Sequence, residues 1–160
     1  MSIKSTFITG FAATLLMTTS AFAEGLMVKD PYARVARPNA PTGAAFMMLM
    51  NHSDQDITLM GVSSDVAKRV ELHTHIDNGE GVMQMTEIEG GITIPAGEMH
   101  IMKRGGDHVM MMGLTQSLVD GETISVTFEF KNGAEMVVEI PVDNARKPKE
   151  GEGHDAHKSH

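Results

Sequence analysis

Short apolar runs alternate with turn-forming residues along this chain, at a spacing of roughly ten residues. This pattern is typical of a β-sandwich or barrel, and no long stretch has the period of an amphipathic helix. Ser64–Lys68 is long enough for one helical turn only. The predicted strands are Tyr32–Ala36, Ala45–Asn51, Ile57–Val62, Arg69–Ile76, Val82–Ile88, Glu98–Lys103, His108–Gly113, Thr123–Phe130 and Glu135–Ile140.

Clusters of glycine, proline, asparagine and aspartate separate these strands. Asn132-Gly133 is the strongest hairpin signal, because both residues tolerate the positive φ of a type I′ turn. The sequence therefore predicts an all-β domain. The other turn segments are Pro38–Gly43, Ser53-Asp54, Asp77–Gly81, Gly90-Gly91, Pro95–Gly97, Gly105-Gly106 and Asp120-Gly121.

The N-terminus has the layout of a secretory signal peptide. Lys4 supplies a positive charge, an apolar stretch runs from Phe7 to Met17, and Ala21-Phe22-Ala23 is a small-x-small cleavage site. The apolar stretch is too short to span a bilayer. We therefore expect residues 1–23 to be removed and the protein to be periplasmic, without membrane insertion. A lipid anchor is not expected, because the sequence has no cysteine.

The remaining chain is predicted to divide into a domain and a tail. Residues 24–143 are enough for one domain with its own core. Residues 144–160 are polar and lack bulky apolar side chains, so they are predicted to be a flexible tail. His154, His157 and His160 lie in this tail, and spaced imidazoles on a flexible chain can bind Cu(II).

The composition indicates the chemistry of the domain. The chain has 15 methionines, 8 histidines and no cysteine. Thioethers are soft ligands that prefer Cu(I), and imidazole suits copper in either oxidation state. In an oxidising compartment a cysteine ligand would itself be oxidised or paired. The net charge of −8 disfavours nucleic acid and anionic membranes as partners. These features together favour copper handling.

Three short segments each carry two potential ligands two residues apart: His73-Thr-His75, Met83-Gln-Met85 and His108-Val-Met110. In a strand, such pairs lie on one face. A hairpin symmetric about Gly79 would place His73 opposite Met85 and His75 opposite Met83. Directly opposite Cβ atoms are about 5 Å apart, so such pairs could share one metal ion.

Other methionines are predicted to fill the core, because methionine is a flexible apolar side chain that packs well. Met111 is included because it alternates with Met110 along its strand. The other expected core methionines are Met47, Met48, Met50, Met60 and Met136.

Several segments of the chain resemble one known family. They are Tyr32-Ala-Arg34, Thr42-Gly-Ala-Ala-Phe46, Val70-Glu-Leu-His73, Gly81-Val-Met-Gln-Met85, Gly90-Gly-Ile-Thr-Ile-Pro-Ala-Gly97 and Gly105-Gly-Asp-His-Val-Met-Met-Met-Gly-Leu114. Together they resemble the periplasmic PCuAC copper chaperones, whose signature is a histidine, a later methionine and then His-x-Met. The resemblance spans roughly residues 26–142.

The resemblance implies a cupredoxin-like Greek-key β-sandwich that binds Cu(I). It implies delivery of copper to a cuproprotein, the dinuclear copper centre of cytochrome oxidase or its assembly factors. Separately, no segment combines a nucleophile, a base and an orienting partner in a recognisable local motif, so the protein is not expected to be an enzyme. The implied ligands are His73, Met85, His108 and Met110. The spacing in this chain is about one residue longer than in the family, so His75 and Met83 are alternative ligands.

Two alternatives remain at this stage. His73-Thr-His75, Glu80 and His100 partly resemble the motifs of cupins, which would bind Fe or Mn in a metalloenzyme. The glycine expected before His73 is absent, and the gap between the motifs is too short. The second alternative is a sandwich that sequesters metal or serves as a scaffold. The identity of the bound metal would separate these interpretations.

Overall fold

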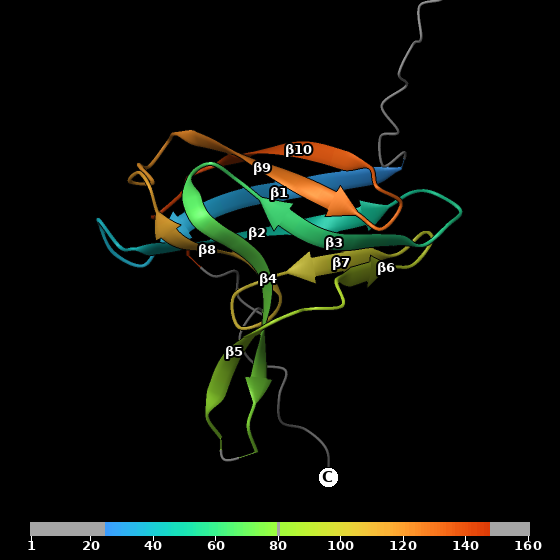
Figure 1. Ribbon diagram of the computed structural model, residues 1–160, viewed down its shortest axis with the longest axis horizontal. Coiled ribbons are helices and arrows are strands. Elements are labelled where there is room, and N and C mark those ends of the chain that lie inside the picture. Colours follow the sequence, from blue (N-terminus) through green and yellow to red (C-terminus); the bar gives the residue numbers. More distant parts are fainter. Residues whose placement is uncertain (1–24, 80, 148–160) are drawn as a thin grey trace, which may run out of the picture.

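The computed structural model describes residues 25–79 and 81–147, and this part of the chain contains strands and no helix (Figure 1). The strands are β1 (Leu26–Val35), β2 (Thr42–Asn51), β3 (Ile57–Ser63), β4 (Ala67–Asp77), β5 (Met83–Glu87), β6 (Ile92–Ile94), β7 (Met99–Met102), β8 (His108–Leu114), β9 (Thr123–Phe130) and β10 (Glu135–Pro141).

The strands form two antiparallel sheets that pack face to face. One sheet has the order β1-β2-β8-β4-β5, with β7 also paired to β2. The second sheet has the order β10-β9-β3-β6. The core between them is apolar, and its largest fully buried side chains include Phe128, Leu49, Leu59 and Ile94. Alternation of buried and exposed residues along β9 shows how a period of two directs one face inward.

Nine of the ten strands were predicted, with small shifts at their ends. The strand over Tyr32–Ala36 begins earlier, at Leu26, because a bulge between Lys29 and Tyr32 lets the pairing continue past Asp30-Pro31. Asp30 lies within this bulge and adopts a positive φ of 53°. The missed strand is β6, which has only three residues and follows Gly90-Gly91 directly.

The predicted hairpin at Asn132-Gly133 is confirmed, but the predicted turn type is wrong. Only Gly133 has a positive φ, of 82°. Its N–H donates to the carbonyl of Phe130 at 2.8 Å, and the Phe130 N–H donates to Ala134 at 2.9 Å. These contacts define a three-residue loop with glycine in the left-handed position, which replaces the expected type I′ turn.

The register predicted for the hairpin of β4 and β5 is also wrong. His75 lies opposite Met85, His73 opposite Glu87, and Asp77 opposite Met83. The centre of the hairpin is therefore residue 80 rather than Gly79, and every partner is shifted by two residues. Figure 1 shows the end of β4 and β5 extending away from the rest of the sheets.

The methionines divide between the core and the surface. Met47 and Met111 are buried, as predicted. Met60 is 42% exposed, so its assignment to the core is wrong. Met136 packs against the core. Met48 and Met50 alternate with the buried residues of β2 and are half-buried on its outer face, so their assignment to the core is also wrong.

The first residues of the expected tail lie against the domain. The Asn144 side chain accepts a hydrogen bond from the Val35 N–H at 2.9 Å. The guanidinium of Arg146 lies 4.2 Å from the ring centroid of Tyr32 and pairs with Asp30.

The histidines of the tail and the expected signal peptide lie outside the described residues. No helix in the described residues is long and apolar enough to cross a bilayer.

Candidate metal centre

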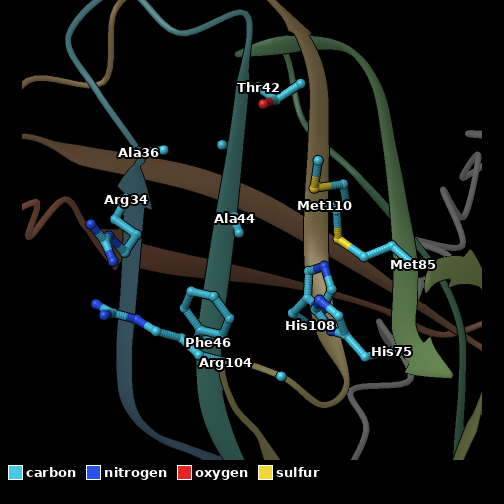
Figure 2. A pocket seen from close by; sticks show the side chains of 12 residues that line it. Arg34, Ala36, Thr42, Ala44, Phe46, His75, Met85, Arg104, His108 and Met110 are labelled. Atoms are coloured by element: carbon cyan, nitrogen blue, oxygen red, sulfur yellow. The ribbon is translucent and has the colours of Figure 1, made fainter. Parts of the chain in front are cut away.

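A pocket of about 390 Å³ opens on the outer face of the larger sheet. His108 and Met110 reach it from β8, and His75 and Met85 reach it from the hairpin of β4 and β5. Figure 2 shows the two sulfur atoms and the two imidazole rings pointing toward one another. Met85, His108 and Met110 from the predicted set therefore meet in one pocket, together with the alternative His75.

The pairing of strands explains why these residues meet. β8 lies between β2 and β4, so His108 has His73 as its direct partner on β4. Residues two apart on one strand share a face, which adds Met110 on β8 and His75 on β4. β5 then supplies Met85 opposite His75. Three adjacent strands thus contribute to one face, and only the sheet topology brings them together.

The carbonyl oxygen of Gly106 orients both histidines of the pocket. Nδ1 of His108 lies 2.9 Å from this oxygen, and Nδ1 of His75 lies 3.3 Å from it. Because a carbonyl can only accept, each Nδ1 donates a proton to it. Nε2 of each ring then carries the lone pair, which is the tautomer that a metal ligand requires.

His73 lies beside the pocket but is held in a different way. Its ring centroid is 6.0 Å from that of His108. Its Nε2 lies 2.9 Å from a carboxylate oxygen of Glu71, so Nε2 is the donor in this pair. Its Nδ1 is buried and has no hydrogen-bond partner. His73 therefore has one free nitrogen, although it does not line the pocket.

His108 is the most buried of these ligands, with 2% of its surface exposed. Burial is the main reason that its pKa lies below the ordinary value of 6.5, and the nearby His75 and His73 lower it further. The hydrogen bond to Gly106 and the charge of Asp107 act in the opposite direction. A neutral imidazole at physiological pH is the form that binds a metal.

Aromatic and cationic side chains complete the wall of the pocket, and the sequence analysis did not single them out. The Phe46 ring lies 6.0 Å from His108 and 5.2 Å from Tyr32, measured between centroids. Arg34 and Arg104 line the same pocket (Figure 2). The Arg104 guanidinium donates to the carbonyl of Arg146 at 2.6 Å. Arg34 and Phe46 do lie in segments that carry the family resemblance.

The remaining candidate ligands lie elsewhere. Met83 is 54% exposed near the tip of the hairpin, opposite Asp77. His100 is on β7, where its Nε2 lies 3.0 Å from a carboxylate oxygen of Asp107. Within residues 25–79 and 81–147, no group of three or more His, Asp or Glu side chains is arranged to hold a metal ion. Of the residues in the partial cupin resemblance, His100 does not line the pocket, and Glu80 lies outside the described residues.

Comparison with known proteins gives the family. The LpqE-like family model matches residues 26–142. The chain belongs to this family, which is the PCuAC family. The protein named "Putative lipoprotein Lxx21020" from Leifsonia xyli is 35% identical over 121 residues, which cover 75% of this chain and 70% of the relative.

Solved members of the family share the fold. The apo form of DR1885 from Deinococcus radiodurans is 30% identical, with a TM-score of 0.60, and the match covers 93% of this chain and 100% of that one. Its Cu(I) form is 34% identical, with a TM-score of 0.58, and the match covers 80% and 86%. The apo PCuAC domain of PmoF1 is 18% identical, with a TM-score of 0.63, over 75% and 94%. The predicted cupredoxin-like fold is confirmed.

Proposed function

We propose that this protein is a periplasmic copper chaperone that carries one Cu(I) ion in the pocket of His75, Met85, His108 and Met110. One observation carries the proposal: two thioethers and two imidazoles with free Nε2 atoms converge in a single pocket. The family supports copper binding, since relatives include a Cu(I) form of DR1885 and a copper-bound PCuAC domain from PmoF2.

The donor set favours the monovalent ion. Four neutral donors, two of them soft sulfurs, suit Cu(I) better than the hard ions Fe(II) or Mn(II). A blue-copper electron carrier uses a cysteine ligand, and this chain has none. His73 is the alternative fourth ligand, because its buried Nδ1 has no other partner.

Access to the pocket supports transfer of copper rather than catalysis. Met85 is 49% exposed, so an acceptor could reach the ion from the side of β5 and displace this thioether first. Arg34 and Arg104 add positive charge to the wall of the pocket in an otherwise acidic protein. Such a wall would complement an acidic acceptor. The proposed acceptor is a periplasmic cuproprotein or assembly factor that serves the dinuclear copper centre of cytochrome oxidase.

Metal competition tests this function against the cupin alternative. The purified protein should retain one Cu(I) through a desalting column under anaerobic conditions and lose Fe(II) and Mn(II) in parallel runs. It should also consume no oxygen with organic substrates when Fe(II) is added. Stoichiometric retention of Fe(II), with no retention of Cu(I), would overturn the proposal.

A further inference from the structure

A second group of methionines lies far from the pocket, on the outer face of the larger sheet. Met27 on β1 is paired with Met50 on β2, and Met50 is paired with Met99 on β7. Directly paired residues lie on the same face of a sheet, so these three side chains form one row across three strands. We refer to Met27, Met50 and Met99 as the methionine row.

Core packing does not account for the methionine row. Met27 is 52% exposed and Met99 is 48% exposed, while Met50 is half-buried between them. Solvent-facing positions of an antiparallel sheet are normally polar, as Thr123, Ser125 and Glu129 are on β9. Two exposed methionines that flank a half-buried one in register are therefore an exception that suggests a ligand.

The chemistry of the row is that of a soft-metal site. Neighbouring Cβ atoms in such a row are about 5 Å apart, and each methionine has three rotatable bonds. The three sulfurs can therefore converge over the central strand. These sulfurs are neutral thioether donors, which prefer a monovalent soft ion. Met48 lies two residues from Met50 on the same face and could supply a fourth sulfur.

We infer that Met27, Met50 and Met99 form a second binding site, for Cu(I) or its analogue Ag(I). The site is separate from the pocket, because Met50 and the pocket residue Phe46 are four residues apart on β2, or about 13 Å at the rise of a strand. The two sites also differ in their response to acid. The pocket contains imidazoles, for which protons compete, whereas thioethers do not titrate.

Methyl NMR of the purified protein labelled with ¹³C at the methionine methyl groups tests the inference. Ag(I) is the probe, because it does not change oxidation state in air. The first equivalent should shift the methyl signals of Met85 and Met110. A later equivalent should shift those of Met27, Met50 and Met99, and this second shift should persist at pH 5, where binding in the pocket is weaker.

Substitution gives the matched comparison. The triple variant Met27→Leu, Met50→Leu, Met99→Leu keeps the apolar surface and removes the sulfurs, so it should bind one Ag(I) fewer and still fill the pocket. Met60→Leu, which removes an exposed methionine of the other sheet, should leave the stoichiometry unchanged. An unchanged stoichiometry in the triple variant, or row signals that do not move in excess Ag(I), would overturn the second site. Neither result would affect the proposed pocket site, because the signals of Met85 and Met110 report metal binding there separately.

Discussion

The rings of His75 and His108 lie 5.3 Å apart, centroid to centroid, and both direct Nδ1 at the carbonyl oxygen of Gly106. One backbone oxygen thus fixes the tautomer of two imidazoles that come from different strands. Both Nε2 atoms are left free without any acidic side chain in the arrangement. The two imidazoles are therefore oriented as neutral ligands by a backbone oxygen rather than by a carboxylate, which suits a monovalent ion.

The first prediction separates His75 from His73. His75→Ala should lower Cu(I) affinity by about a hundredfold or more, since it removes a ligand, whereas an outer hydrogen-bond partner of a ligand typically contributes 10–100-fold. Glu71→Gln removes the charged partner of His73 and should change the affinity by less than about threefold if His73 is not a ligand. Anaerobic titration against a chromophoric Cu(I) chelator measures both variants. A loss of tenfold or more in Glu71→Gln would make His73 a ligand.

Acid should weaken the apo fold through His108. Its folded pKa lies below the ordinary 6.5, so between these two values the unfolded chain binds a proton that the folded chain does not. The free energy of unfolding should therefore fall as the pH drops from 7.5 through 6.5, until the folded pKa is reached. Urea unfolding at pH 7.5, 6.5 and 5.5 measures this effect, and His108→Asn should show a shallower slope. Equal slopes in the two proteins would contradict this account of His108.

Gly91 and Gly97 give a matched test of packing. Both have a φ of 73°, but a Cβ at Gly91 would lie 2.4 Å from the carbonyl oxygen of Leu59, while nothing lies within 4 Å of a Cβ at Gly97. Gly97→Ala should cost about 1 kcal/mol of strain. Gly91→Ala should cost about 3 kcal/mol or more, because backbone must move. Thermal unfolding of the two variants measures the difference in stability. Equal losses of stability would show that the close approach of Gly91 to Leu59 does not determine the cost of the substitution.

The tail prediction concerns the divalent ion. His154, His157 and His160 should bind Cu(II), so removing residues 148–160 should abolish Cu(II) binding and leave the Cu(I) stoichiometry of the pocket unchanged. Cutting after Lys147 keeps the contacts of Asn144 and Arg146 with the domain. Electron paramagnetic resonance of Cu(II) added to both proteins measures the loss. An undiminished Cu(II) signal would rule out the tail as its site.

Much of the fold could be predicted because each strand carries its own local pattern. Thr123–Phe130 alternates cleanly and was found with its exact bounds. The errors came from features that local pattern does not encode. The predicted strand began only at Tyr32, whereas the pairing of β1 with β2 extends through a bulge to Leu26. β6 is too short to show a period, and its partner β3 defines it.

The candidate site was predictable in its residue types but not in its pairing. The i, i+2 spacing placed His108 with Met110 on one face, and both line the pocket. The register of β4 and β5 depends on the conformation of the loop, so the predicted pairing of His73 with Met85 was off by two residues. The role of the Gly106 carbonyl could not be predicted, because a backbone contact leaves no signal in side-chain type.

The most direct test of the account is the Cu(I) affinity of the double variant Met85→Leu, Met110→Leu. Leucine keeps the volume and apolar character of both side chains, so the fold should survive and circular dichroism should be unchanged. Anaerobic competition with a chromophoric chelator should show one tightly bound Cu(I) in the parent protein and in the control variant Met60→Leu. The double variant should lose affinity by about a hundredfold or more, which is equivalent to about 2.7 kcal/mol. An unchanged affinity in the double variant would show that copper does not bind in this pocket through its thioethers.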